Sequence, residues 1–81
     1  MQKEYTVDKK RLGAELRLLR KERKMTQTHA GKQVGLSYVT LVRLETGQSE
    51  MTLSTLCKLS NLYQEPPLNI LGKIIKDLIQ K

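Results

Sequence analysis

Residues 26–47, with the sequence TQTHAGKQVGLSYVTLVRLETG, place the strongest limit on how this chain can fold. The hydroxyl of Thr26 is suited to cap a first short helix, Gly35 can take the left-handed conformation that ends it, and Ser37 can cap a second helix. Because the Gly-Leu-Ser connection is so short, the two helices must cross steeply. The inner side of this corner is predicted to hold Val34, Leu36, Leu41 and Leu44. The outer side is predicted to hold Tyr38, Val39, Val42 and Arg43.

The composition favours a single small helical domain. The 81 residues include no Trp, no Phe and three Tyr, and no alternating run of β-branched residues is present. Leu, Ile and Val at helical spacing must therefore form the interior. Ordering the chain costs roughly 1.5 kcal/mol per residue, so a partner subunit would help to offset that cost. We predict an all-α fold over residues 1–81.

Three further helices are predicted outside residues 26–45. The first begins near Asp8 and presents one apolar stripe, formed by Leu12, Leu16 and Leu19. The fourth begins after Thr52, and its apolar positions, from Leu53 to Tyr63, are interpreted as core. The last follows a Gln-Glu-Pro-Pro break and covers about residues 67–80. The chain should thus contain five helices.

Ordered motifs on both sides of the turn give the chain a family resemblance. A Leu16-Arg17-x-x-Arg20 run precedes Thr26-Gln27, the turn has the form Gly35-x-Ser37, and the second helix ends in Leu44-Glu45-x-Gly47. The run Thr52-Leu53-Ser-Thr-Leu56-x-Lys-Leu59 follows. This pattern resembles the helix-turn-helix family of lambdoid phage repressors and the small bacterial regulators built like them. The resemblance implies a five-helix, lambda-repressor-like domain that binds double-stranded DNA.

In proteins of this kind the second helix of the motif enters the major groove. Arg43 is our candidate for reading a guanine, with contact to a phosphate as the alternative. Val39 and Val42 are candidates for thymine methyl groups, unless one of them packs inward. Gln27, at the positive end of its helix, is expected to hold a phosphate. The full set of expected DNA contacts is Thr26, Gln27, Ser37, Tyr38, Val39, Thr40, Val42, Arg43 and Gln48.

Two arginines continue the apolar stripe of the first helix, where charged groups need partners. The resemblance implies that Arg20 forms a structural ion pair with Glu45, the residue shortly before Gly47. A partly buried bidentate pair of this kind would fix the first helix against the third. Arg23 is expected to face solvent or a phosphate.

The net charge of +7 is concentrated near the beginning of the chain. Residues 1–25 hold nine basic and four acidic side chains. Such a run is commonly just a solvated face, but beside the turn motif it favours attraction to phosphate. The loop over residues 46–50 departs from the family because Glu50 stands where relatives often have a cation. Its phosphate contacts would have to come from polar side chains such as Gln48 and from backbone amides.

The middle of the second helix also departs from the family. It reads His29-Ala30-Gly31 where relatives commonly have Glu-Leu-Ala. A glycine inside a helix costs about 1 kcal/mol relative to alanine, so this segment should be loose unless Tyr38 or a side chain of the first helix fills the space. His29 has no Cys, His or carboxylate at ligand spacing, and we expect no metal there.

The remaining features exclude several classes of function. Cys57 is the only cysteine, which excludes an internal disulfide and indicates a reducing compartment; we expect its thiol to be buried and inert. No apolar run is long enough for a signal core or a membrane span. No nucleophile with its base, carboxylate pair or phosphate-binding glycine loop is evident, so neither an enzyme nor a cofactor is expected. A cytoplasmic, nucleoid-associated protein is the natural interpretation.

The last helix is too apolar for a single buried stripe, which predicts self-association. The expected dimer interface comprises Ile70, Leu71, Ile74, Ile75 and Leu78. A two-fold dimer would place two recognition helices ~34 Å apart on a near-palindromic operator. In the alternative, the helix is fully used by its own core. With the self-associating helix, the chain is predicted to be a dimeric repressor or a restriction-modification controller protein. The alternatives are an antitoxin-type regulator with a toxin partner, or a protein-interaction module that uses the last helix.

Overall fold

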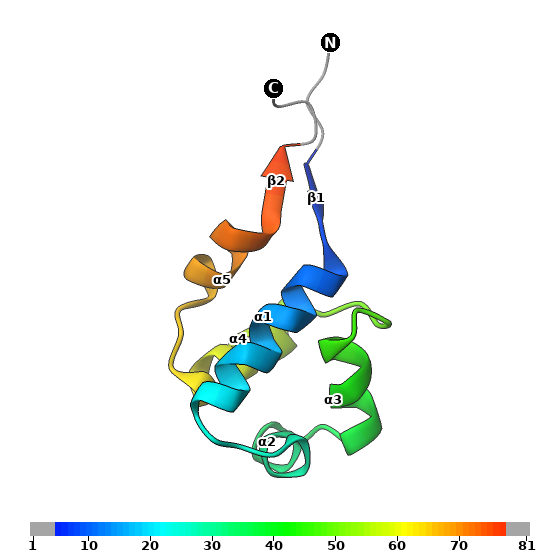
Figure 1. The fold of residues 1–81 in the computed structure, drawn as a ribbon, viewed down its shortest axis with the longest axis vertical. Helices are drawn as coiled ribbons and strands as arrows, with labels where there is room; N and C mark the ends of the chain where they lie inside the picture. Colours follow the sequence, from blue (N-terminus) through cyan, green and yellow to red (C-terminus); the bar gives the residue numbers. More distant parts are fainter. Residues whose placement is uncertain (1–4, 78–81) are drawn as a thin grey trace.

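The computed structural model describes residues 5–77 and contains the five predicted helices together with two short strands (Figure 1). In chain order the elements are β1 (Tyr5–Val7), α1 (Lys9–Glu22), α2 (Gln27–Val34), α3 (Tyr38–Glu45), α4 (Leu53–Tyr63), α5 (Pro67–Ile74) and β2 (Ile75–Asp77). The helices form one compact body, and the two strands project from one end of it along the longest axis.

Four helices begin at the polar residues that the sequence indicated. Asp8, Thr26, Ser37 and Thr52 each accept a hydrogen bond from the backbone N–H three residues later, which satisfies an otherwise unpaired donor of the first turn. The fifth helix has no side-chain cap and instead has Pro67 at its start. Local capping chemistry therefore determines where the helices begin.

The core lies between α1 and the other helices. Its ten buried apolar side chains are Leu12, Leu16, Leu19, Ala30, Leu41, Leu56, Leu59, Tyr63, Ile70 and Ile74. The three leucines of the α1 stripe are all among them, as the spacing predicted. Since every helix contributes at least one member, the small core joins all five helices.

The C-terminal segment differs from the prediction of a helix over about residues 67–80. α5 ends at Ile74, and Ile75–Asp77 form β2, which pairs antiparallel with β1 in the register Tyr5↔Asp77, Thr6↔Lys76 and Val7↔Ile75. The helical prediction was wrong for these residues because β1, distant in sequence, supplies a strand partner and the β-branched Ile75 suits a strand as well as a helix. We call β1 and β2 together the terminal ribbon.

Burial also corrects the expected dimer interface. Ile70 and Ile74 are 0% and 1% exposed, so they close the core of their own protomer and cannot meet a partner. Leu71 is half-buried and Ile75 is 41% exposed. Leu78 lies outside the described residues. The apolar surface that α5 leaves uncovered is formed instead by Leu68, Leu71 and Ile75.

Two smaller expectations fail as well. Cys57 is exposed on α4, so its thiol is not the buried group that its position in the apolar pattern indicated. The space beside Gly31 is not vacant: a Cβ atom built there would lie 2.6 Å from the carbonyl oxygen of Leu36. Gly31 permits this close approach of the turn, and neither Tyr38 nor a side chain of α1 is needed to fill a gap.

Candidate nucleic-acid interface

The corner between α2 and α3 is built by backbone hydrogen bonds around a left-handed glycine. Gly35 has φ of 75°, which ends α2, and the N–H of Leu36 donates to the carbonyl of Gly31 at 2.8 Å. Ser37 then caps α3, and its hydroxyl also donates to Thr40 Oγ1 at 2.9 Å. These contacts fix the direction in which α3 leaves the turn.

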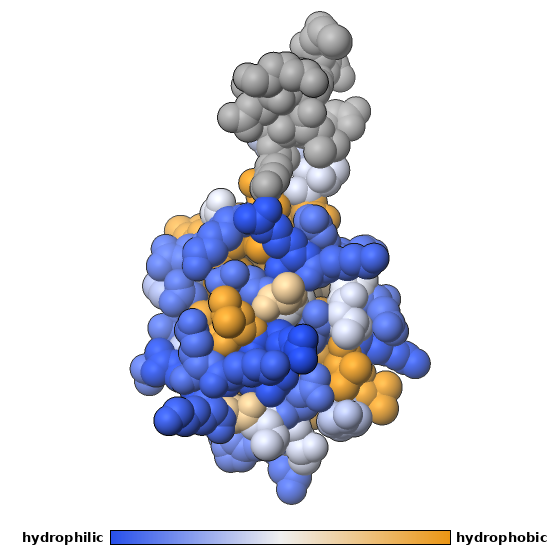
Figure 2. All heavy atoms as spheres, viewed as in Figure 1, coloured by the Kyte–Doolittle hydropathy of each residue, from blue (hydrophilic) through white to orange (hydrophobic). Residues whose placement is uncertain are grey.

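One side of α3 faces solvent and carries most of the residues predicted to touch DNA. Tyr38 and Val39 are 55% and 54% exposed, Thr40 and Arg43 are also exposed, and Val42 is half-buried. Leu41 and Leu44, on the opposite side of the helix, are buried. Figure 2 shows apolar atoms on the surface over α3 within an otherwise largely hydrophilic face.

The other end of α3 is anchored to α1 by a buried ion pair. Arg20 Nε donates to Glu45 Oε2 at 2.7 Å, and a second guanidinium nitrogen donates to Glu45 Oε1 at 3.1 Å. The third nitrogen donates to the carbonyl of Met25 at 2.8 Å. Hydrogen bonding to Glu45 raises the pKa of Arg20, so the guanidinium stays charged. The pair expected from the sequence is therefore present, and its bidentate geometry restricts rotation of α3 against α1.

Gln27 joins the same network at the start of α2. Its Nε2 donates to Glu45 Oε1 at 3.0 Å, and its side chain is part-buried. One carboxylate thus connects α1, α2 and α3. Thr26 uses its hydroxyl oxygen as the cap that accepts from the N–H of His29. The first turn of α2 is consequently held at a fixed position beside the exposed side of α3.

The loop after α3 is ordered by its own backbone contacts. The N–H of Gln48 donates to the carbonyl of Arg43 at 2.8 Å, and Gly47 has φ of 77°. A Cβ atom at Gly47 would lie 2.8 Å from the backbone of Lys10, so the loop packs closely on the start of α1. The side chain of Gln48 remains exposed beside the end of α3.

The acidic residue of this loop is partly neutralised. Lys9 Nζ lies 3.2 Å from Glu50 Oε2 in an exposed ion pair. Exposed pairs of this kind contribute little to stability. The pairing nevertheless reduces the repulsion that Glu50 alone would exert on a nearby phosphate.

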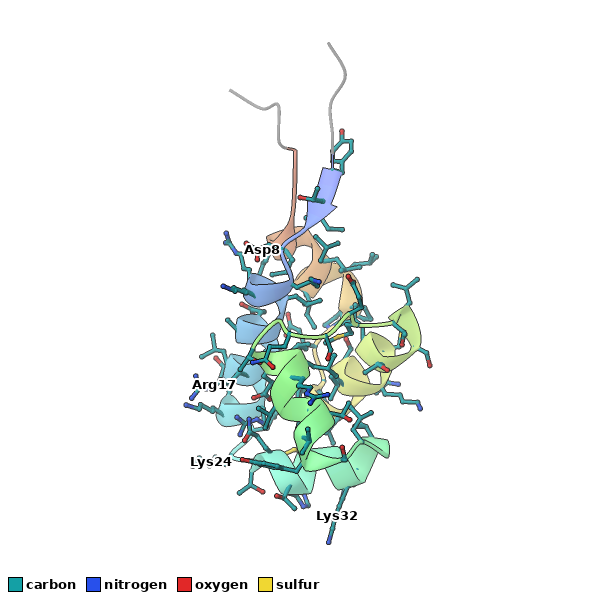
Figure 3. All side chains as sticks on the ribbon, turned by 90° about the vertical axis from the view of Figure 1, so that its right-hand side faces the viewer. Asp8, Arg17, Lys24 and Lys32 are labelled. Atoms are coloured by element: carbon teal, nitrogen blue, oxygen red, sulfur yellow. The ribbon has the colours of Figure 1, made fainter. Side chains whose placement is uncertain are left out.

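Sequence reasoning did not single out the individual cations of α1 beside this surface. A shallow open pocket next to Glu45 is lined by Ala14, Arg17, Leu18 and Lys21. Figure 3 views the molecule with α3 toward the reader, and Arg17 and Lys24 lie to one side of it while Lys32 lies below. The four-residue spacing of Arg17 and Lys21 places them on one face of α1, and this spacing is the sequence feature that could have predicted the cationic group.

Arg23 is exposed, as expected, and its guanidinium also makes a contact that the sequence did not indicate. Its Nε donates to the carbonyl of Tyr63 at 2.9 Å, so it satisfies an acceptor at the end of α4. It therefore joins the ends of α1 and α4 rather than only facing solvent or a phosphate. The contact spans forty residues of sequence and has no local signal.

Residues 5–77 hold no group of three or more His, Cys, Asp or Glu side chains that could bind a metal ion. Within that same range, no helix has the length and apolar character needed to cross a bilayer.

The sequence matches a family model, and the structure resembles several solved proteins. Residues 11–69 match a model described as a helix-turn-helix domain. No curated protein sequence gives a significant match. The matched range covers most of α1 and all of α2, α3 and α4, and therefore includes the exposed side of α3 and the Arg20–Glu45 pair.

Three solved structures illustrate the likeness. The restriction-modification controller protein C.AhdI from Aeromonas hydrophila aligns with a TM-score of 0.74 and 25% identity, covering 78% of this chain and 91% of that chain. The clp gene regulator ClgR from Corynebacterium glutamicum aligns with a TM-score of 0.75 and 23% identity, covering 80% and 84%. The c2 repressor of phage P22, solved as a complex with a synthetic operator, aligns with a TM-score of 0.68 and 32% identity, covering 73% and 89%. The five-helix arrangement predicted from the sequence is confirmed by these alignments.

Proposed function

The chain belongs to the helix-turn-helix domain family, and we propose that it is a transcription regulator that binds double-stranded DNA in a sequence-specific manner. The observation that supports this most strongly is the exposed side of α3, held rigidly by the Arg20–Glu45 pair behind it. An apolar surface on a short, firmly anchored helix is difficult to explain by contact with water alone. It suits a major groove, where thymine methyl groups and base edges alternate.

Arg43 is assigned the main role in reading sequence. It is exposed in the last turn of α3, on the same side of the helix as Val39, and a guanidinium can bond O6 and N7 of one guanine together. Val39 and Val42 are assigned to thymine methyl groups, with Val42 contributing less because it is half-buried. Tyr38 and Thr40, near the start of α3, lie where further base or phosphate contacts are expected.

A second group of residues is assigned to the DNA backbone. Gln27 is the first residue of α2, where the helix dipole favours binding of an anion such as a phosphate. Thr26 and Ser37 cap α2 and α3 and so fix where the two helices begin. Gln48 extends the contact from the loop after α3. Arg17, Lys24 and Lys32, which flank α3 in Figure 3, supply charge around this surface. The net charge of +7 is consistent with such a polyanionic partner.

The finer role we propose is that of a repressor or a restriction-modification controller protein. Two of the structures described above, the phage c2 repressor and C.AhdI, are named for these activities. We further propose a homodimer on a near-palindromic operator, since one short recognition helix reads few base pairs and two-fold pairing doubles the contact. Because its proposed target is DNA, we also propose that the protein is located in the cytoplasm, in association with the nucleoid.

The test is duplex binding by the full chain at increasing salt concentration. Affinity should fall with a log–log slope of about −0.9 for each phosphate contact. A footprint on the DNA flanking the protein's own coding region should then show two half-sites about one helical turn apart. Binding that is insensitive to salt, or no protected site beyond the non-specific background, would contradict the proposed function.

A further inference from the structure

The terminal ribbon is an unusual addition to the helical body because so little of the described structure supports it. It consists of two three-residue strands that project from the end of the molecule (Figure 1). An isolated two-stranded sheet is marginally stable in water, and three or more strands are usually needed. A further strand would therefore stabilise the ribbon.

Three exposed apolar side chains also lie on one face of the ribbon. Residues opposite one another in the register, and residues two apart along a strand, point to the same face of a sheet. Tyr5, Val7 and Ile75 consequently share one face, and they are 66%, 47% and 41% exposed. Figure 2 shows apolar atoms gathered where the ribbon meets the helices. In the isolated protomer these apolar side chains therefore remain in contact with water.

The outer edge of β1 is open, since within residues 5–77 it pairs only with β2. An open edge is a template for another strand, and proteins commonly protect such edges with charged residues or proline. β1 has the sequence Tyr-Thr-Val and has neither protection. The partner that fits this edge is therefore an extended strand.

The sequence of β1 is complementary to itself. If two copies pair antiparallel about a two-fold axis at Thr6, Tyr5 of one lies opposite Val7 of the other and the two Thr6 residues lie opposite each other. Aromatic with β-branched, and Thr with Thr, are favourable cross-strand pairs. The arrangement is isologous, as a two-fold interface requires. It also creates a four-stranded sheet in which Tyr5, Val7 and Ile75 of both copies lie on one face.

We propose that the edge of β1 is the docking site for a second copy of this chain, with the two strands antiparallel and centred on Thr6. The proposal rests on the proposed DNA-binding function in one respect only: a two-fold dimer suits a near-palindromic operator. It assigns the interface to the end of the molecule that bears the ribbon, and it makes residues 5–7 necessary for dimerisation.

Site-directed cross-linking of the full chain tests this geometry without DNA. Because Cys57 is exposed, all variants would carry Cys57→Ser. Opposed residues of an antiparallel pair have Cα atoms about 4.5–5.5 Å apart, which a disulfide can bridge. Thr6→Cys should form a covalent dimer on mild oxidation. Tyr5→Cys is the matched control, since in this register the two Tyr5 positions are diagonal neighbours about 7–8 Å apart.

We expect Thr6→Cys to cross-link at least about tenfold faster than Tyr5→Cys, because docking raises the effective concentration of only one thiol pair. The double variant Tyr5→Cys/Val7→Cys should cross-link as readily as Thr6→Cys. Equal rates for Thr6→Cys and Tyr5→Cys would show random collision and overturn the proposal.

Sedimentation equilibrium gives a second, independent readout. Tyr5→Lys should weaken the dimer at least about tenfold, because it places a charge in the apolar cross-strand contact. Leu68→Lys, at an 80% exposed position of α5, is the control and should leave the dimer unchanged. A monomeric wild-type chain, or a dimer weakened by Leu68→Lys and not by Tyr5→Lys, would overturn the assignment to β1. Neither result depends on DNA, so a failure here is distinct from a failure of the proposed function.

Discussion

Arg20 and Glu45, twenty-five residues apart in sequence, form a bidentate ion pair that is almost completely removed from solvent. The side chains are 8% and 1% exposed, and the shortest contact is 2.7 Å. The pair links the end of α1 to the end of α3, and Gln27 adds the start of α2 to the same carboxylate. One buried carboxylate thus joins the proposed recognition helix to both α1 and α2.

The first prediction concerns the stability of this pair. Glu45→Ala should lower the free energy of unfolding by about 3–5 kcal/mol, because it leaves the guanidinium of Arg20 buried without its counter-charge. The double variant Arg20→Met/Glu45→Leu should lose much less than the sum of its single changes, since both charges are then absent. Urea denaturation measures all three values. A loss below about 1 kcal/mol in Glu45→Ala would contradict the structural role of the pair.

The second prediction compares two helical glycines, one packed closely against backbone and the other facing open space. Gly31→Ala should lower the free energy of unfolding by about 1–3 kcal/mol, because its Cβ would lie 2.6 Å from the backbone oxygen of Leu36. Gly72→Ala is the control: no atom lies within 4 Å of its Cβ position, so better helix propensity should add roughly 0.5–1 kcal/mol. Thermal unfolding of both variants checks this. If both were stabilised equally, the close approach at the α2–α3 turn would be disproved.

The third prediction concerns alkaline pH. Burial raises the pKa of Tyr63 to about 12, and the charge of Glu45 acts in the same direction. Since the folded-state pKa lies above the value of about 10 for an unfolded tyrosine, the associated stability is complete below pH 10 and is lost as pH rises through 12. The difference amounts to roughly 2–3 kcal/mol.

Urea denaturation between about pH 8 and 12 tests this, with Tyr63→Phe as the control. The phenol oxygen of Tyr63 has no hydrogen-bond partner among the described residues, so the variant should fold normally at neutral pH. Its stability should decline less over this range than that of the wild type. An identical alkaline decline in both proteins would assign the effect to another group.

The fourth prediction concerns the assigned phosphate contact of α2. Gln27→Ala should weaken binding to every duplex by a similar factor and reduce the salt slope by about 1, because phosphate contacts are indifferent to sequence. It also removes the hydrogen bond to Glu45, so stability must be measured in parallel. Fluorescence anisotropy with specific and scrambled duplexes checks this. A selective loss at the specific site alone would instead make Gln27 a base-reading residue.

The sequence was sufficient for features that depend on local chemistry. Thr26, Ser37 and Thr52 cap their helices through hydrogen bonds to residues only three positions away, so the signal and its effect lie together. The Arg20–Glu45 pair was also expected, but only through the family resemblance. Its partners are distant in sequence and no local pattern joins them.

Features that depend on distant partners were missed. Nothing within residues 67–80 indicates that the helix stops at Ile74, because the strand that competes for Ile75–Asp77 is Tyr5–Val7, seventy residues earlier. The contact of Arg23 with the Tyr63 carbonyl is hidden for the same reason. At Gly31 the sequence indicates only a missing side chain inside a helix, and the folded turn shows how closely the carbonyl of Leu36 approaches it.

The specificity ratio of one variant measures whether α3 reads DNA sequence through Arg43. A site would be selected from random duplexes with the wild-type protein, and dissociation constants would be measured for that site and for a scrambled duplex. Lys73→Ala is a charge-matched control, because Lys73 is on α5, which Figure 1 shows on the other side of the body from α3, and pairs there with Glu15. Arg43→Ala should lower the ratio of the two constants by a factor equivalent to about 1–3 kcal/mol, while Lys73→Ala leaves the ratio unchanged. If Arg43→Ala weakens binding to both duplexes by the same factor, α3 does not read the sequence through this residue.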